Sequence, residues 1–531
     1  MDLLIQGGLI VDGSGEKPFY GDVAVERDRI VAVGQNLDAS QARRVVDARG
    51  LTVTPGLIDG HTHSELSLLK NRQHPNAVYQ GISTVVTGQC GLGFAPMRPE
   101  QMEDSIRINS GIFGDYRHYL KPWRTFGEFL EQLDGSAVNV AANVSHNAVR
   151  QMVCGFKDKE MDARELEEAR QVVAQAMEEG AVGLSVGLSY YPGGYSNTEE
   201  LVELCKAVKE YDGLFCVHQR LNDGQVPLSP VEESAEVVRR TGVRLNMLHY
   251  RTGGTEDIQT LFAPFEELEK AGAEISYEYY PYLVGAGLLL ALVPGWAQEG
   301  SADEILGRLT SKELRARLVK EMDERHPYFF GEGQTARIIL TKDPYSAYLG
   351  KTVDEVAAEH GESFSEAVIR ILVDNELEAG FAGIENQTPE LKEKLYEDQY
   401  RLFLDERYTI GSDTIPAGVL CHPRAFGSFS RIIAMMRRRG VPVEFIIKKL
   451  TSMPAKLYHL EGRGLLRPGM YADICLMDYE KVEDQATFEH SRRRPEGMHS
   501  LYVNGLPAME DGTLTGILAG KAVRRGNDGL L

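Results

Sequence analysis

Four histidines and a cysteine follow short apolar stretches of the sequence, and these residue types bind metal ions. His61 and His63 stand two residues apart in GLIDGHTHSE, and on a strand this spacing sends both imidazoles to one side. His218 ends LFCVH, and His249 ends RLNMLH. A single histidine of this kind is more often structural, but imidazoles at corresponding strand ends can share one divalent cation. The agreement of all four favours a metal site.

Cys90 ends the stretch STVVTGQC, where Gly88 and Gly91 allow the backbone to turn closely beside a ligand. Metal-dependent hydrolases built on a barrel of parallel strands commonly need an anionic metal ligand, often a carboxylated lysine at the fourth strand. The stretch AVGLSVGLSYYPGG, where the fourth strand is expected, contains no lysine. A thiolate can supply the missing charge, because a neighbouring dication deprotonates a coordinating thiol. The remaining cysteines have no such setting and are interpreted as core residues: Cys154, Cys205, Cys216, Cys421 and Cys475.

Asp413 follows the last of these apolar stretches, in YTIGSDTIP. A carboxylate at this place can take a proton from an attacking water and later give it to a departing amine. A turn-capping aspartate is the alternative for any Ser-Asp-Thr sequence. Its position relative to the histidines favours a catalytic role.

Helical patterns alternate with short apolar runs between residues 136 and 282, as in repeated β/α units around a parallel sheet. The first helix has a capping-box pair, Asp162 and Glu165, and Gly180 stands where it would end. Three more helices are predicted over residues 199–211, 230–240 and 257–271. Each precedes an apolar run.

Extending the pattern in both directions predicts eight strands, the number that closes a TIM-type (β/α)8 barrel of the α/β class. Catalytic groups of such barrels converge at the carboxyl ends of the strands. The predicted strand ends lie near His63, Cys90, His146, Tyr190, His218, His249, Tyr282 and Asp413.

Two further units are expected beside the barrel domain, which we assign to residues 56–464. About 125 residues separate the seventh and eighth strands, too many for a plain loop, so a helical insertion is predicted over about 285–405. Within it, Gly361 breaks one helix and Ser363 with Glu366 begins another. Residues 1–55 and 465–531 are rich in short β runs and turns, and together they predict a small β-sandwich domain.

The composition limits the possible partners. A formal charge of -21 argues against broad contact with nucleic acid or an anionic membrane. Hydrophobic residues make up 43% of the chain, but no apolar run approaches the roughly 20 residues that span a bilayer. The amino terminus resembles a strand and turn rather than a signal peptide, and the six cysteines contain no CxxC pair. We therefore expect a cytoplasmic protein with a small-molecule substrate.

With these motifs in view, the chain resembles the D-aminoacylase family, the N-acyl-D-amino-acid deacylases of the amidohydrolase superfamily. The similarity spans nearly the whole sequence. It includes PGLIDGHTH, GISTVVTGQCGLGFAP, GLSVGLSYYPG and HPRAFGSFSRII. The cysteine of TGQCG and the segment around HPR are the specific features. The resemblance implies zinc-dependent hydrolysis of the amide bond of N-acyl-D-amino acids, with one essential zinc and a second possible.

The resemblance also implies a role for each site residue. His218 and His249 correspond to ligands of the essential zinc, Cys90 to the shared thiolate, and His61 with His63 to ligands of the optional metal. Asp413 corresponds to the general base and acid. The substrate carboxylate is gripped at positions that here are Arg251, Tyr282 and Arg424, and Tyr190 is a candidate for polarising the carbonyl.

Two positions depart from the family pattern. Arg251 stands where relatives often have lysine, and Tyr250 stands where they often have a second histidine. Because an arginine fork is geometrically stricter than an ammonium group, substrate preference stays open.

Two other functions remain as alternatives. A cyclic-amide hydrolase of the hydantoinase or dihydroorotase kind shares the barrel, the HxH pair and the final aspartate. A non-catalytic scaffold with this fold would not need to keep five ligands and Asp413. The sequence leaves open the preferred side chain and acyl group, the number of metal ions and the oligomeric state.

Overall fold

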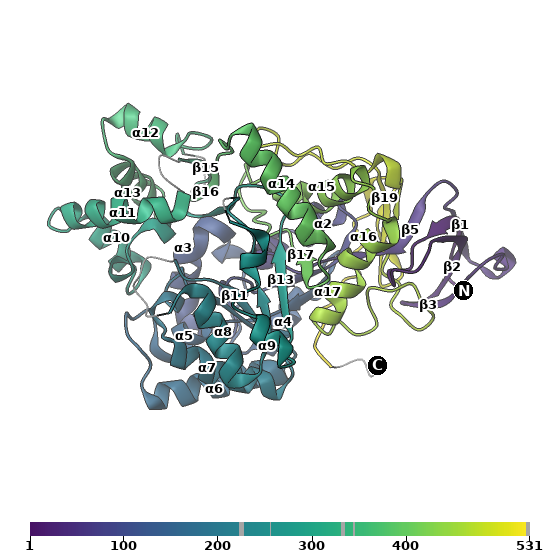
Figure 1. Ribbon diagram of the computed structural model, residues 1–531, viewed down its shortest axis with the longest axis horizontal. Coiled ribbons are helices and arrows are strands. Elements are labelled where there is room, and N and C mark those ends of the chain that lie inside the picture. Colours follow the sequence, from purple (N-terminus) through teal and green to yellow (C-terminus); the bar gives the residue numbers. More distant parts are fainter. Residues whose placement is uncertain (222–227, 255, 331–334, 343–345, 527–531) are drawn as a thin grey trace.

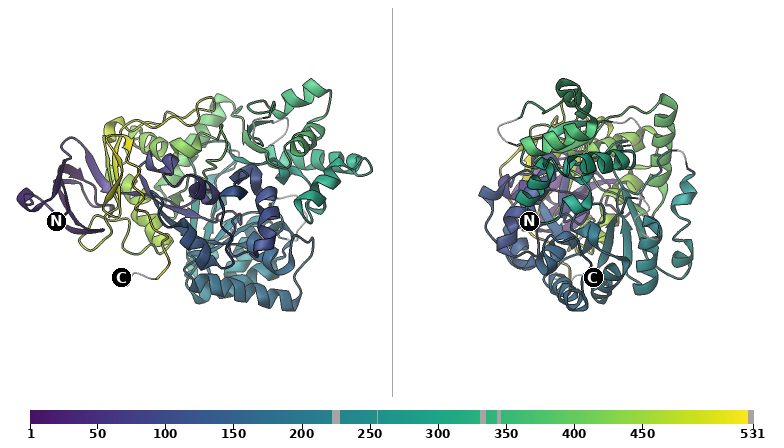
Figure 2. Two further views of the ribbon diagram at one scale, coloured as in Figure 1. Left: turned by 180° about the vertical axis from the view of Figure 1, so that it is seen from behind. Right: turned by 90° about the vertical axis from the view of Figure 1, so that its left-hand side faces the viewer.

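The structure is a computed structural model that describes residues 1–221, 228–254, 256–330, 335–342 and 346–526. The molecule is elongated, with the strands β1 (Leu3–Ile10) and β2 (Phe19–Glu26) at one end of its long axis. Helices α10 (Ala302–Thr310) and α13 (Phe364–Asp374) lie at the other end, and Figure 2 shows the same arrangement from behind. No helix within the described ranges is long and apolar enough to cross a membrane.

A six-stranded sheet lies in the middle of the molecule, and all of its neighbouring strands are parallel. In spatial order its strands are β9 (Val144–Ser145), β10 (Gly183–Gly187), β11 (Leu214–His218), β12 (Arg244–Met247), β13 (Ile275–Tyr279) and β17 (Tyr408–Ile410). Both faces of a parallel sheet of this kind are covered, so its strands are expected to be buried along their whole length. The burial pattern agrees, since every residue of β10, β12 and β17 is buried.

A second parallel sheet continues this arrangement. It contains β6 (Leu57–Asp59), β7 (Ile82–Thr87) and β8 (Asn139–Ala142). One residue separates β8 from β9, and an isolated parallel bridge joins Thr62, beyond β6, to Thr414, beyond β17. Strands therefore occur at all eight predicted places, with β8 and β9 sharing one of them.

The helices between these strands largely follow the sequence pattern. Helix α6 (Ala163–Glu178) begins at a capping box formed by Asp162 and Glu165, and α7 (Thr198–Glu210) and α8 (Pro230–Thr241) match their predicted ranges. The helix predicted over 257–271 is wrong as one element. It is divided into the 3-10 helix Ile258–Leu261 and α9 (Glu266–Lys270), because Pro264 between them has no N–H to donate.

Other helices of the described chain also lie outside the insertion. In chain order they are α1 (Glu65–Lys70), α2 (Pro75–Val78), α3 (Met102–Phe113), α4 (Phe126–Leu133), α5 (His146–Cys154), α15 (Arg424–Arg438), α16 (Val443–Leu450) and α17 (Ser452–Leu457). A capping box at Thr125 and Glu128 begins α4. Helix α15 is the element that follows β17. It begins at Arg424, which therefore lies near the carboxyl ends of the strands.

The insertion is not purely helical, which corrects the prediction. Besides α10 and α13 it contains α11 (Arg315–Phe330), α12 (Val353–His360) and α14 (Pro389–Leu404). It also contains an antiparallel sheet of β14 (Ala286–Leu288), β16 (Gly380–Gly383) and β15 (Ala336–Leu340). Strands of three to five residues are too short to give a reliable periodic signal. The capping box of Ser363 with Glu366 at the start of α13 is confirmed.

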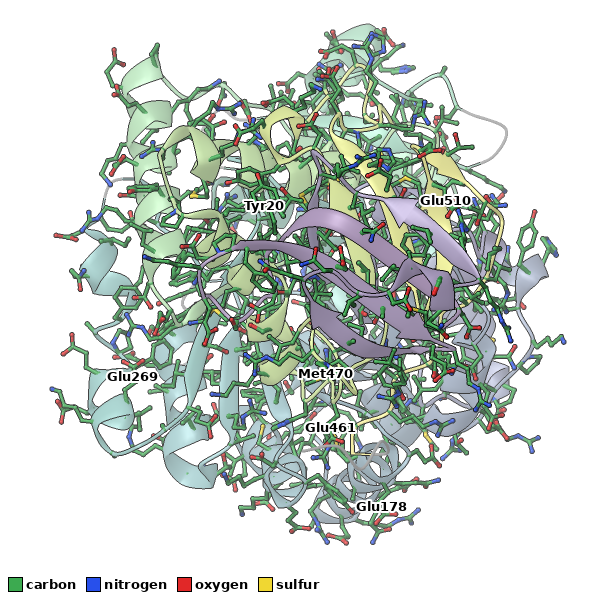
Figure 3. All side chains as sticks on the ribbon, turned by 90° about the vertical axis from the view of Figure 1, so that its right-hand side faces the viewer. Tyr20, Glu178, Glu269, Glu461, Met470 and Glu510 are labelled. Atoms are coloured by element: carbon green, nitrogen blue, oxygen red, sulfur yellow. The ribbon has the colours of Figure 1, made fainter. Side chains whose placement is uncertain are left out.

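Both ends of the chain contribute to one nine-stranded sheet, in which β5 (Thr52–Pro55) pairs with β18 (Ile474–Met477). The other strands are β3 (Arg29–Gly34), β4 (Arg44–Asp47), β19 (Met498–Val503), β20 (Leu506–Glu510) and β21 (Thr513–Leu514), besides β1 and β2. Ile5 and Val23 from one chain end share a buried apolar cluster with Ile474 and Leu476 from the other. Figure 3 looks onto this end of the molecule, between the labelled Tyr20 and Glu510.

Candidate active site

The five predicted metal ligands meet at the carboxyl ends of the parallel strands. His61, His63 and Cys90 form one cluster, and Cys90, His218 and His249 form another; within each, the ligand atoms lie within 4.8 Å of one another. Cys90 belongs to both clusters. Its Sγ lies 3.3 Å from Nε2 of His61 and 3.6 Å from Nε2 of His249.

The distances among these donors are close to those around a tetrahedral zinc ion, with one nitrogen–nitrogen distance shorter. Ordinary Zn–N and Zn–S bond lengths predict edges of about 3.3 Å between two nitrogens and about 3.6 Å between nitrogen and sulfur. Nδ1 of His218 lies 2.9 Å from Nε2 of His249, and the sulfur of Cys90 lies 3.6 Å from the same nitrogen. A small outward movement of His218 would complete three corners of a tetrahedron. The soft thiolate and two imidazoles are a donor set that zinc prefers.

Three of the site residues occupy the left-handed backbone region that favours glycine. The φ angles are +54° at Cys90, +39° at His249 and +50° at Asp413, and each residue follows a strand. Such conformations cost of order 1–3 kcal/mol and persist where the surroundings hold them. At these turns the three side chains point towards the same site, whereas successive side chains of a regular strand point to opposite faces of the sheet.

Close backbone approach brings Cys90 to the end of β10. A Cβ atom at Gly187 would lie 1.8 Å from the carbonyl oxygen of Cys90, and one at Gly91 would lie 2.3 Å from the nitrogen of Gly187. Neither distance is possible for a real side chain. The paired glycines therefore let the turn that carries Cys90 pack against the strand that leads to Ser189 and Tyr190.

Glu278, on β13, holds His61 from behind. Its Oε2 lies 2.5 Å from Nδ1 of His61, and both side chains are buried. Burial alone would lower the pKa of His61, but Glu278, Cys90 and Asp413 raise it well above its usual value. A carboxylate at Nδ1 leaves Nε2 of His61 pointing at Cys90 and Asp413, the orientation that ligation requires.

The other donors differ in charge state. Burial lowers the pKa of His218 to about 4, and burial together with His218 lowers the pKa of His249 further below its usual value. Both imidazoles are therefore neutral near pH 7 and ready to ligate. Burial raises the pKa of the Cys90 thiol to about 11, so this thiol keeps its proton unless a metal cation lies beside it.

Asp413 faces the first cluster and Arg424. Its Oδ1 lies 3.2 Å from Nε2 of His63 and 3.4 Å from Nε2 of His61, and its Oδ2 lies 2.8 Å from Nη1 of Arg424. Burial would raise the pKa of the carboxyl, but Arg424, His61 and His63 outweigh it and hold the pKa well below its usual range. The carboxylate is therefore ionised, and it lies between the histidine cluster and the guanidinium of Arg424.

The two predicted arginines both lie against the ring of a tyrosine, Tyr280, that the sequence did not single out. The guanidinium of Arg251 lies 4.7 Å from the ring centre of Tyr280, and that of Arg424 lies 4.8 Å from it. Arg251 also donates to the carbonyl oxygens of Tyr282 and Leu283. The arrangement concentrates two cations beside the metal ligands.

The structure does not bring the Tyr282 hydroxyl to this group. That hydroxyl donates to Asp484 at 2.8 Å, and Arg431 lies 4.7 Å from its ring centre. Only the main-chain carbonyl of Tyr282 faces Arg251. Tyr190 does lie at the site, with its ring centre 4.8 Å from that of His218.

Ser189 fixes the orientation of His218. Its buried hydroxyl lies 2.7 Å from Nε2 of His218, while Nδ1 of the same ring points towards His249. Partners of this kind orient a metal-ligating histidine and typically change metal affinity by 10–100-fold. We expect Ser189→Ala to weaken zinc binding by about this factor and Ser189→Thr to preserve it, as measured by chelator competition. Equal zinc affinity in Ser189→Ala and the parent would contradict this role.

Glu278, Ser189 and Tyr280 are therefore the site residues that sequence reasoning missed. Glu278 carried a signal, since a carboxylate within the apolar run ISYEYY has to find a partner when it is buried. Ser189 and Tyr280 carried none, because their roles come from turns that follow β10 and β13.

Comparison with known proteins agrees with this geometry. The sequence profile of the amidohydrolase family matches residues 44–325 and 348–509, and the chain belongs to this family. D-aminoacylase from Alcaligenes xylosoxydans xylosoxydans is 32% identical, with 99% of this chain and 98% of the relative covered. The resemblance to the D-aminoacylase family is thus confirmed over nearly the whole chain.

Solved structures extend the comparison to metal content. A D-aminoacylase structure concerned with its binuclear metal centre has a TM-score of 0.78 and 30% identity, with 99% of this chain and 100% of that chain covered. N-acyl-D-glutamate deacylase from Bordetella bronchiseptica, complexed with zinc and a phosphonate inhibitor, has a TM-score of 0.79 and 25% identity, with 99% of each chain covered. A D-hydantoinase, at 14% identity and a TM-score of 0.55, shares the fold alone.

Proposed function

We propose that this chain is a zinc-dependent N-acyl-D-amino-acid deacylase, which hydrolyses the amide bond to a carboxylic acid and a free D-amino acid. The observation that carries the proposal is the position of Cys90 Sγ between His61 on one side and His249 on the other. The cluster of His218, His249 and Cys90 would hold the essential zinc. His61, His63 and the shared thiolate would hold a second ion.

Zinc supplies a Lewis acid that polarises the acyl carbonyl and increases the acidity of water. Asp413 supplies the proton movement. Its Oδ1 faces the histidine cluster, so it takes the proton of the attacking water there and carries it to the nitrogen of the departing amine. Tyr190, whose ring packs beside that of His218, would donate its hydroxyl proton in a hydrogen bond to the acyl carbonyl oxygen.

The substrate carboxylate would bind between Arg251 and Arg424. Their guanidinium groups lie on the same tyrosine ring, and an arginine fork matches the planar carboxylate. Tyr282 would act through its main-chain carbonyl, which accepts a hydrogen bond from Arg251. Tyr280 would hold both guanidinium groups in position through its ring.

We propose a barrel domain and a β-sandwich domain for this chain. The eight strand places, in two parallel sheets joined by the Thr62–Thr414 bridge, support one (β/α)8 barrel over residues 56–464. The nine-stranded sheet with its own apolar cluster supports a β-sandwich of residues 1–55 and 465–531. We also propose a cytoplasmic location, because all six cysteines are unpaired and Cys90 must stay reduced to bind zinc.

A substrate screen tests this function. The zinc-supplied protein is incubated with N-acetyl-D-amino acids, N-acetyl-L-amino acids, hydantoin and dihydroorotate, and release of free amine or ring-opened product is measured. We expect turnover of D-amides only. Preferential opening of the cyclic amides would instead support the hydantoinase-like alternative.

Removal of the Arg251 charge should affect substrate binding more than chemistry. A hydrogen bond to a charged group contributes about 1.5–3 kcal/mol, so we expect Arg251→Met to raise KM about 10–100-fold with a smaller change in kcat. Arg251→Lys retains the cation and should recover part of the loss. An unchanged KM for Arg251→Met in steady-state kinetics would remove Arg251 from the carboxylate site.

A further inference from the structure

The β10–α7 loop, residues 188–197, carries two residues of the candidate site. The Ser189 hydroxyl lies 2.7 Å from Nε2 of His218, and the ring of Tyr190 packs beside the same imidazole. Apart from the 3-10 helix Gly193–Tyr195, the loop is irregular, and it contains two adjacent glycines. Because glycines leave a backbone free to adopt other conformations, contacts from outside the loop must determine where its side chains lie.

Arg220 supplies several of these contacts, and it stands two residues after His218. Its Nη1 donates to the carbonyl oxygen of Gly194 at 2.9 Å, and its Nη2 donates to the carbonyl oxygen of Ser196. The hydroxyl of Ser196 lies 3.3 Å from the same Nη2. The side chain of Arg220 is only 7% exposed, so water competes little for these hydrogen bonds. The guanidinium therefore joins the loop to the segment that carries a metal ligand.

Glu233, on α8, balances the charge of Arg220. Its Oε2 accepts a hydrogen bond from Nε of Arg220 at 2.8 Å, and its Oε1 lies 3.3 Å from Nη2. The same carboxylate accepts from the hydroxyl of Thr198, the first residue of α7, at 3.0 Å. Both charged side chains are buried, and a buried ion pair contributes little net stability because both groups lose their hydration. The geometry that the pair imposes on the loop explains it better than stability does.

The loop is also held from the side of α5. The backbone nitrogen of Gly193 donates to Oδ1 of Asn147 at 2.7 Å, and a Cβ at Gly193 would lie 2.2 Å from that oxygen. Within the loop, the nitrogen of Gly194 donates to the carbonyl oxygen of Tyr190 at 2.7 Å. The loop is thus fixed between α5 and the segment after β11, and a shift of Gly194 is passed on to Tyr190.

We propose that Arg220 is a positioning residue of the metal site, which holds the β10–α7 loop so that Ser189 orients His218 for zinc and Tyr190 faces the acyl carbonyl. Arg220 acts through the loop and is not itself a ligand. Its effect on turnover rests on the proposed deacylase function, whereas its effect on zinc affinity does not depend on the substrate. Lysine offers its donors from one nitrogen, so it cannot span two carbonyl oxygens and a carboxylate as the guanidinium fork does.

Zinc affinity, measured by chelator competition, provides the first test. We expect Arg220→Met to weaken zinc binding about 10–100-fold, the usual effect of losing support for a metal-ligating histidine, and Arg220→Lys to recover only part of the loss. In a Ser189→Ala background, Arg220→Met should change the affinity by less than about 3-fold, because the hydroxyl through which Arg220 acts is already gone. Full additivity of the two substitutions, or unchanged zinc affinity in Arg220→Met, would overturn the proposal.

Arg463→Met is the matched control. Arg463 is another buried arginine, 3% exposed, and its equally buried partner Asp473 lies just before β18 of the nine-stranded sheet. This control also leaves a buried carboxylate without its cation, so it should lower the melting temperature as Arg220→Met does, with zinc affinity within about 3-fold of the parent. If Arg220→Met does not fold, Arg220→Lys and Arg463→Lys, which keep both charges, make the same comparison. An equal loss of zinc affinity at the two positions would show general destabilisation and contradict the proposal.

Steady-state kinetics at saturating zinc separate this role from the proposed function. The substrate is the N-acetyl-D-amino acid that the parent protein cleaves fastest in the screen described above. We expect Arg220→Lys to lower kcat at least about 10-fold with KM within about 3-fold, since Tyr190 belongs to the loop whereas Arg251 and Arg424 do not. A change in KM alone would contradict the proposal. If the parent cleaves no N-acetyl-D-amino acid while the zinc affinities change as expected, the deacylase function is wrong and the positioning role at the metal site stands.

Discussion

Asp413→Asn should abolish nearly all turnover while leaving zinc bound. Asparagine keeps the shape of the side chain and can still accept a hydrogen bond from His63, but it cannot carry a proton between water and amine. General acid–base groups contribute about 10²–10⁴-fold, and we expect kcat to fall by at least about 1000-fold because one residue performs both transfers. Single-turnover kinetics and zinc analysis of the same preparation measure the two quantities.

Asp405→Asn is the matched control for this substitution. Asp405 lies just before β17 and pairs with Arg407, whereas Asp413 follows the same strand at the site. Activity of the control should stay within about 3-fold of the parent, as for a partly exposed ion pair remote from the chemistry. Retention of a tenth or more of the parent kcat by Asp413→Asn would remove Asp413 from the proton-transfer role.

Cys90→Ala should cost the protein its tightly bound zinc and, with it, the activity. The sulfur is the shared donor of both ligand clusters, and alanine offers no replacement for its charge. Loss of one ligand from a three-residue zinc site leaves two imidazoles, so we expect the zinc dissociation constant to rise at least about 100-fold. Equilibrium dialysis against zinc buffers measures this change independently of turnover.

Cys205→Ala provides the corresponding control. Cys205 is fully buried on α7 and its pKa is raised by burial alone, so it is a thiol of similar setting away from the cluster. This variant should retain zinc and activity. If Cys90→Ala binds zinc as tightly as Cys205→Ala does, the sulfur is not a ligand.

The ligand set could be predicted because each donor follows an apolar run and donor atoms of parallel strands converge at one edge. His61, His63, Cys90, His218 and His249 all carried this signal, and the structure brings them together. The residues that hold these ligands in position were harder to predict. The contact of Glu278 with His61 joins residues 217 positions apart, and the hydroxyl of Ser189 reaches His218 only because of the turn after β10.

The parts of the fold that depend on neighbouring residues could also be predicted, whereas those that depend on residues far apart in the sequence could not. Capping boxes at Asp162 and Ser363 are local, and both helices begin where they predict. The prediction of one helix over 257–271 was wrong because it followed the apolar periodicity, and Pro264 interrupts the helix. The sheet of β14, β15 and β16 was missed because its strands are too short to show a period and pair with strands far along the chain, about 95 residues away for β14 with β16 and about 45 for β15 with β16.

Zinc-edge X-ray absorption of the zinc-loaded protein tests the central claim most directly, since it reports the atoms bonded to the ion. The account predicts one sulfur scatterer at about 2.3 Å beside nitrogen and oxygen scatterers near 2.0–2.1 Å, with the sulfur lost in Cys90→Ser. A spectrum of the parent protein with only nitrogen and oxygen neighbours would contradict it.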